Sequence, residues 1–209
     1  MISNSPYRSA GIWFAPLVLM ALMLIAECLG DWGRAAFAYD RGLILEGQWW
    51  RLLTGNFVHL GWYHLFLNQM GVLVLVLLCP ENLSGWAWLR RVVWLSVFMT
   101  LCLLAFVPQM HRYVGMSGVI HGLFVLGLLP QVMRRDLIAS GCLAYLTAKI
   151  AWEFFAGAPV SDEAAIGGHV ATESHLYGVV GALAYTAVFR TLRGEEAFKA
   201  SPAQDNIKE

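Results

Sequence analysis

Charged residues are scarce in this sequence. Aspartate, glutamate, lysine and arginine make up only 13% of the 209 residues, whereas 58% of the residues are hydrophobic. An ordinary soluble domain contains about a quarter charged residues, so this composition excludes that class. The formal net charge is zero. The charge balance therefore gives no reason to expect a nucleic-acid partner or an acidic partner.

Cysteine pairs with a recognisable spacing are also missing. The four cysteines show no C-x-x-C pattern, and each lies within or at the edge of an apolar run. Cysteines in such places behave as small buried hydrophobic residues. We therefore predict that these cysteines form no disulfide and bind no metal. The sequence also shows no internal repeat, which disfavours a transporter built from repeated halves.

Long apolar runs dominate the chain and predict an all-α, polytopic membrane protein. Six membrane-spanning helices are predicted at residues 11–29, 62–78, 89–107, 117–133, 137–155 and 175–189. They form one membrane domain, residues 11–192, between a tail at 1–10 and a polar, frayed or disordered tail at 193–209. The first run is too long for the apolar core of a signal peptide, so we expect a retained helix. Tryptophans in the connection at 30–58 indicate a segment at the membrane interface.

Basic residues are distributed unevenly between the two ends of the predicted bundle. If the N-terminus is cytoplasmic, the pairs Arg90–Arg91 and Arg134–Arg135 face the cytoplasm, while the opposite loop at 156–174 has no lysine or arginine. Cytoplasmic loops of membrane proteins carry an excess of these residues. Both termini are therefore predicted to lie in the cytoplasm.

Polar residues recur at one depth in three of the predicted spans. Counted from the cytoplasmic ends, Ser117, His175 and His64 lie roughly 25, 22 and 24 Å along their helices at a rise of about 1.5 Å per residue. The hydrocarbon layer is about 30 Å thick, so the three share a layer several Å below its outer boundary. Polar groups inside a membrane are costly, and they are candidates for a functional site by default.

The residue types in this layer are those required for acyl transfer, which needs a nucleophile, a base and donors directed at an oxyanion. Ser117 is the candidate nucleophile and His175 the candidate base. His64 and Asn68, at positions i and i+4, share a helix face. Both can donate to an oxyanion, as can the backbone N–H of Ser117, which the helix dipole assists.

Glycines surround the candidate nucleophile. Gly115 permits a sharp turn into the helix, so that Ser117 lies near its N-terminus. Gly118 and Gly178 allow the fourth and sixth helices to approach closely enough for a serine–histidine hydrogen bond. The alternative for an isolated G-x-S-G motif is simple packing of two membrane helices through small residues.

Three further polar residues lie close to this layer. His121 is one turn deeper than Ser117 on the same face, and its side chain points poorly at that hydroxyl. His121 is therefore a weak candidate for the base. It is a better candidate for a residue that tunes the Ser117–His175 pair or forms a hydrogen bond to another helix. Lys149 and Glu153, at i and i+4, form either an ion pair whose lysine reaches towards the membrane surface or a contact for a substrate's tail.

Four motifs together resemble those of the rhomboid family of intramembrane serine proteases. Residues 115–118 are similar to the family's G-x-S-G, 59–68 to its H-x-x-x-x-H-x-x-x-N, 175–178 to its A-H-x-x-G, and 50–51 to its W-R. Ser174 replaces the usual alanine before His175. The resemblance implies a six-helix bundle with a Ser117–His175 dyad and no metal or cofactor. It also implies an oxyanion site made by His64, Asn68 and the Ser117 amide.

The compact core and the run G-x-S-G-x-x-H-G at 115–122 resemble the rhombosortase branch of that family. This implies a multi-pass protease of the bacterial inner membrane whose site opens to the periplasmic side. Its expected substrates are membrane-anchored proteins with a C-terminal Gly-Gly, a hydrophobic helix and a basic tail. Two alternatives remain open: an inactive rhomboid-like binder of membrane proteins, and a membrane cytochrome that binds haem through paired histidines.

Overall fold

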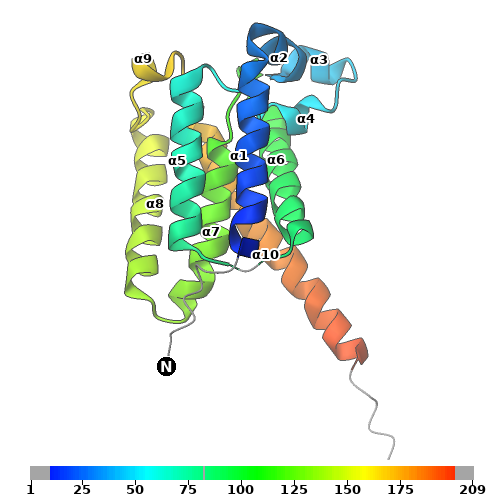
Figure 1. Cartoon of the computed structure of the whole chain (residues 1–209), viewed down its shortest axis with the longest axis vertical. Helices are drawn as coiled ribbons and strands as arrows, with labels where there is room; N and C mark the ends of the chain where they lie inside the picture. The colour runs from blue at the N-terminus through cyan, green and yellow to red at the C-terminus, as the bar shows by residue number, and fades with distance from the viewer. Residues whose placement is uncertain (1–9, 82, 201–209) are drawn as a thin grey trace, which may run out of the picture.

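Six long helices account for most of the described chain, residues 10–81 and 83–200, in this computed structural model (Figure 1). The long helices are α1 (Ala10–Cys28), α5 (Trp62–Leu78), α6 (Gly85–Phe106), α7 (Ser117–Met133), α8 (Leu137–Ala156) and α10 (Thr172–Ala200). The short elements are α2 (Gly30–Phe37), β1 (Tyr39–Asp40), α3 (Arg41–Leu45), α4 (Arg51–Thr54), β2 (Arg112–Tyr113) and α9 (Glu163–Ile166). The predicted all-α class is confirmed.

Each predicted span coincides with one long helix, although some ends differ. Helix α6 begins at Gly85 rather than Leu89, because the Ser84 side chain accepts a hydrogen bond from the Ala87 N–H and caps the helix. Helix α10 begins three residues before His175 and continues to Ala200, where an irregular tail was predicted. Most of residues 193–200 are good helix formers, which explains the continuation. Residues 1–9 and 201–209 of the predicted tails lie outside the described residues.

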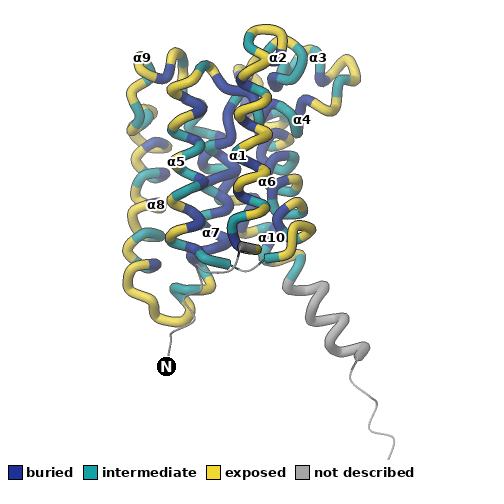
Figure 2. Tube along the Cα trace, in the orientation of Figure 1, coloured by how far each residue is buried: buried dark blue, intermediate teal, exposed yellow. Residues whose placement is uncertain are grey.

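Helix α7 is the central element of the bundle. It contacts α5, α6, α8 and α10, and its residues from Val125 to Leu128 are all buried. Figure 2 shows it buried behind the more exposed outer faces of α1, α5 and α8. A helix that is apolar on all sides needs such surroundings. The first residue of this central helix is Ser117.

Three glycines bring the backbones of α7 and α10 into contact. A Cβ atom on Gly118 would lie 2.6 Å from the carbonyl oxygen of Ser174, and one on Gly122 would lie 2.6 Å from that of Gly178. A Cβ atom on Gly178 would overlap the carbonyl oxygen of Gly118. Small residues permit this close approach between helices. The first turn of α10 is thereby held against the first turn of α7.

The connection between α1 and α5 folds into a compact cover at the upper end of the bundle (Figure 1). The buried guanidinium of Arg51 donates to the carbonyl oxygens of Ala38 at 2.7 Å and Ala35 at 3.0 Å. The hydroxyl of Thr100 on α6 lies 2.7 Å from the carbonyl oxygens of both Leu52 and Ser96, a contact that joins the cover to the bundle. Strands β1 and β2 pair antiparallel. The tryptophans predicted a segment at the membrane interface, but the short elements within it were not predicted.

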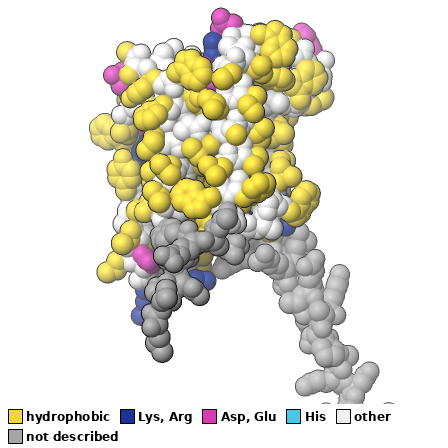
Figure 3. Space-filling view, viewed as in Figure 1, with side chains coloured by type: hydrophobic (Ala, Val, Ile, Leu, Met, Phe, Trp, Pro, Cys, Tyr) yellow, Lys and Arg dark blue, Asp and Glu magenta, His cyan; other side chains and the backbone are white. Residues whose placement is uncertain are grey.

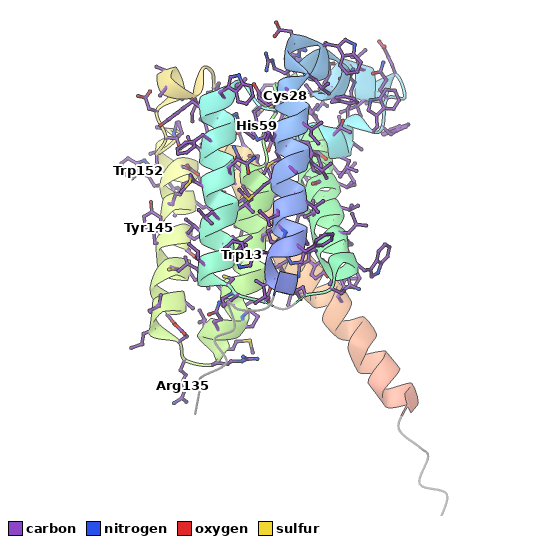
Figure 4. All side chains as sticks on the ribbon, in the orientation of Figure 1. Trp13, Cys28, His59, Arg135, Tyr145 and Trp152 are labelled. Carbon is purple, nitrogen blue, oxygen red and sulfur yellow. The ribbon has the colours of Figure 1, made fainter. Side chains whose placement is uncertain are left out.

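The outer surface of the bundle is strongly apolar. Two described helices, Gly11–Cys28 and Gly85–Phe106, are long and apolar enough to cross a membrane, and Trp62–Leu78 and Ser117–Met133 are shorter apolar helices. Hydrophobic side chains cover most of the face seen in Figure 3, with charged groups near its two ends. Tyr145 and Trp152, which are 66% and 60% exposed, point outward from α8 (Figure 4). Such exposed apolar area is typical of a protein embedded in lipid.

The contact between α7 and α10 predicts opposite effects for two glycine-to-alanine substitutions. Gly178→Ala should lower the free energy of unfolding by about 1–3 kcal/mol, because the new methyl group forces the two backbones apart. Gly141→Ala is the matched control, since a Cβ atom there meets nothing within 4 Å. It should stabilise α8 slightly, because alanine is the better helix former. Thermal unfolding in detergent measures both. Equal behaviour of the two variants would contradict the close contact.

Candidate active site

Ser117 and His175 lie together at the start of their helices. The Oγ atom of Ser117 is 3.1 Å from Nε2 of His175, within hydrogen-bonding distance. His175 is only 3% exposed, and Ser117 is half-buried. Fifty-eight residues separate the two along the chain. The glycine contact between α7 and α10 brings them together.

The backbone before Ser117 requires glycine for two reasons. Gly115 has φ +116°, a conformation that residues with a side chain rarely adopt. A Cβ atom there would also lie 2.6 Å from Cε1 of His64. The Gly115 N–H donates to the carbonyl oxygen of Gly55 at 3.1 Å, and its own carbonyl accepts from the hydroxyl of Tyr113. Burial raises the pKa of Tyr113 to about 12, which keeps this hydroxyl protonated as a donor.

His64 and Asn68 occupy the first turns of α5 and are both buried. Nδ1 of His64 lies 3.4 Å from the backbone N–H of Leu60 and accepts from it, which leaves the ring proton on Nε2. Asn68 donates one N–H to the carbonyl oxygen of His64 at 2.9 Å and retains a second donor. The ring of His59 packs edge-on against His64, with the ring centres 5.1 Å apart. Burial lowers the pKa of His59 to about 3, so this neighbour is neutral.

Glu153 of α8 contacts the other side of the His175 ring. Its Oε2 atom is 2.8 Å from Nδ1 of His175, and its Oε1 atom is 2.7 Å from Nζ of Lys149. Glu153 is 2% exposed, and its ion pair with Lys149 lies inside the bundle rather than at the membrane surface. Both residues were candidates from the sequence because of their i, i+4 spacing, but that spacing does not predict a contact with His175.

His121 packs directly on His175. The two rings are stacked, with centres 4.1 Å apart and an angle of 17° between their planes. Nε2 of His121 is 3.1 Å from the Lys149 ammonium, which can only donate. The ring proton therefore lies on Nδ1, which donates to the carbonyl oxygen of Ser117 at 2.7 Å. Both nitrogens of His121 are thus occupied, and neither faces the Ser117 hydroxyl as a base.

A cavity of about 630 Å³ opens beside these groups. Its lining includes the polar residues His64, Asn68, Ser117, His121, Lys149 and His175, and further polar groups come from the connecting segments, such as Arg34, Arg112 and His169. An apolar part is formed by Leu67, Ile120 and Phe124, and Ile166 of α9 also lines the cavity. Among the described residues, no group of three or more His, Cys, Asp or Glu side chains is arranged to hold a metal ion.

All the residues nominated from the sequence therefore fall within one region. Helices α5, α7 and α10 supply its polar groups from their first turns, and α8 supplies Lys149 and Glu153 from its last. A hydroxyl, an imidazole nitrogen within hydrogen-bonding distance of it, and nearby N–H donors form a set suited to base-assisted attack on a carbonyl.

The family of the chain follows from its similarity to known proteins. Residues 46–192 match the model of the Rhomboid domain. A Bacillus subtilis (strain 168) protein named "Putative rhomboid protease YdcA" is 28% identical over 107 residues, which cover 51% of this chain and 53% of the relative. The match thus spans about half the length of that curated relative. Because the domain match extends over most of the sequence, the chain belongs to the rhomboid family of membrane-embedded, intramembrane proteases.

Proposed function

We propose that this protein is an intramembrane serine endopeptidase that acts through a Ser117–His175 dyad. The supporting observation is the 3.1 Å contact between Ser117 Oγ and His175 Nε2 beside the cavity. Ser117 attacks the carbonyl carbon of the scissile peptide while His175 takes its proton. His175 then returns the proton to the leaving amine, and water or another nucleophile releases the acyl group.

The developing oxyanion is stabilised by three donors in this proposal. The Nε2–H of His64 and the second amide N–H of Asn68 belong to buried side chains that line the cavity. The backbone N–H of Ser117 is at the first position of α7, where helix N–H groups have no intrahelical partner. The helix dipole adds a favourable potential there. Donors held in place before the reaction cost no reorganisation when charge develops.

The six long helices span the bacterial inner membrane in this proposal, with both termini in the cytoplasm. The site lies towards the end of the bundle that carries α2, α3 and α9 (Figure 1). His59 is near that end, and Arg135 lies at the opposite end (Figure 4). The arginine pairs at 90–91 and 134–135 thus favour the lower end as cytoplasmic. The site then opens to the periplasmic side.

The substrates are membrane-anchored proteins, proposed to carry a C-terminal Gly-Gly, a hydrophobic helix and a basic tail. A peptide bond inside an intact helix is shielded, so the substrate must unwind before it is cleaved. Glycine favours unwinding, because each glycine costs a helix about 1 kcal/mol relative to alanine. The run at 115–122 that resembles rhombosortases lies beside the cavity, and it includes His121. Lys149 also lines the cavity, and a third N–H, beyond those directed at Glu153 and His121, is proposed to contact a substrate's tail.

The two alternative functions fit the site less well. An inactive binder needs no serine hydroxyl directed at an imidazole nitrogen, yet Ser117 and His175 are in contact. A haem-binding cytochrome needs two histidines on opposite faces of an iron. His59 packs against His64, while His121 and His175 stack face to face, so neither pair leaves space for a haem between its rings.

Removal of either dyad residue should abolish cleavage. Ser117→Ala and His175→Ala should each reduce the rate by at least about 10³-fold, because nucleophile and base act as one unit. Processing of a co-expressed membrane-anchored substrate, followed by immunoblot, measures the loss. Ser140→Ala is the control, since this serine lies in the first turn of α8, whereas Lys149 and Glu153 lie in the last turns of that helix. Undiminished processing by the Ser117 or His175 variant would exclude the dyad.

Loss of one oxyanion donor should have a smaller effect. Asn68→Ala should reduce kcat by about 10²-fold and leave KM within a few-fold, because the donor acts mainly in the transition state. The neighbouring amide, Gln69, donates to the carbonyl oxygen of Met20 on α1 instead. Gln69→Ala should therefore retain kcat. Steady-state kinetics in detergent separate the two, and equal losses would argue against an oxyanion role for Asn68.

Substrate choice is tested separately with matched substrates. A reporter with a Gly-Gly, apolar-helix, basic tail should be cleaved faster than one in which Leu-Leu replaces Gly-Gly, since leucine stabilises the helix that must unwind. Cleavage of both by the wild-type protein but not by Ser117→Ala would preserve the protease assignment. Equal cleavage rates for the two reporters would contradict the proposed preference for Gly-Gly tails.

A further inference from the structure

Glu153 is the one acidic group in the described chain that contacts the dyad. It reaches His175 from α8, on the side of the ring opposite Ser117, with a distance of 2.8 Å from Oε2 to Nδ1. The contact is sequestered, since the side chains of His175 and Glu153 are 4% and 1% exposed. The resemblance to rhomboids implies a dyad and assigns no group to this nitrogen.

The charge state of Glu153 determines which nitrogen of His175 carries the proton. Glu153 forms an ion pair with Lys149 at 2.7 Å, so it is a carboxylate that can only accept hydrogen bonds. Nδ1 of His175 also lies 3.4 Å from the Lys149 ammonium, but its 2.8 Å contact with the carboxylate is the shorter one, so His175 donates to Glu153 from Nδ1. Neutral imidazole has one N–H, which leaves Nε2 unprotonated and directed at Ser117 Oγ. This is the form of histidine that can remove the hydroxyl proton.

We propose that Glu153 is a positioning residue that completes a Ser117–His175–Glu153 triad. The inference rests on the proposed proteolytic function and deepens it. In serine hydrolases of other folds, a buried carboxylate holds the imidazole in the correct tautomer and stabilises the imidazolium that forms. Glu153 has the geometry for both tasks, and it comes from a helix different from those that carry the nucleophile and the base.

Lys149 offsets the free-energy cost of burying the ionised carboxylate of Glu153. An isolated ionised carboxylate inside a protein is costly unless it is paired and hydrogen-bonded. Lys149 supplies the opposite charge and also donates to His121 at 3.1 Å. The ring of His121, fixed in this way, stacks on His175. The orientation of His175 is thus restrained by a carboxylate at its edge and by an aromatic ring on its face.

The proton balance of the reaction needs no other group. As the bond from Ser117 Oγ to the substrate carbon forms, the hydroxyl proton moves to Nε2 of His175. The imidazolium then carries a proton on each nitrogen, and the one on Nδ1 remains bonded to Glu153 throughout. When the C–N bond breaks, the Nε2 proton passes to the leaving amine. Glu153 remains ionised at every step.

The test is an isosteric substitution. Glu153→Gln should lower kcat by roughly 10²- to 10⁴-fold and leave KM within about 3-fold, because an amide can hold the wrong tautomer. Glu153→Asp retains the charge and should recover part of the rate. Glu46→Gln, at an exposed loop position, is the matched control and should retain wild-type kinetics. In the Ser117→Ala background, Glu153→Gln should produce no further loss, because the residues act as one unit.

A second variant separates catalysis from folding. Glu153→Gln leaves the Lys149 charge without its partner, which can destabilise the protein. The double variant Glu153→Gln with Lys149→Met removes both charges, and it should unfold near the wild-type temperature yet remain slow. A folded double variant with kcat within about 3-fold of wild type would overturn the triad. The dyad would survive that result, whereas cleavage by Ser117→Ala would refute the proposed function itself.

Discussion

The contact between the backbones of α7 and α10 is the constraint on which the site depends. Gly118 and Gly178 leave no space between the two helices for a side chain. A separation larger by one methyl group would stretch the 3.1 Å contact between Ser117 and His175 beyond a hydrogen bond. In a bilayer, where lipid tails compete equally for apolar surface, helix association depends on such close packing. The geometry of the site and the stability of the fold therefore have a common origin.

The polar cluster around His175 carries a cost that the rest of the bundle must offset. Lys149, Glu153, His121 and His175 are joined by hydrogen bonds and an ion pair and enclosed among apolar helices. Replacement of buried ion pairs by apolar residues is often neutral or stabilising, so stability alone gives little reason to keep this one. The proposed control of the proton on His175 supplies a chemical reason. Glu153 bonds His175, His121 stacks on its ring, and Lys149 neutralises the charge of Glu153.

Hydropathy and spacing were sufficient to predict much of the molecule. Each apolar run became one long helix, and depth along the helices placed Ser117, His64 and His175 in a common layer. The cover made by α2, α3, α4 and the β1–β2 pair was not predicted. Its elements are short and are held by distant partners, such as the bond from Arg51 to the Ala38 carbonyl. Local periodicity cannot reveal a tertiary contact between segments that are distant in the sequence.

The sequence by itself determined the family resemblance, the helices and the depth of each polar residue, because these follow from local composition and a fixed rise per residue. Only the tertiary structure decided which nitrogen of His175 faces Ser117 and what holds the other. The sequence placed Glu153 on a helix and at a depth along it. It did not determine how that helix is rotated about its axis, and so did not show that Glu153 faces α10. Packing of α8 against α7 and α10 sets that rotation. It directs the carboxylate to Nδ1 of His175, and it leaves His121 no nitrogen with which to act as the base.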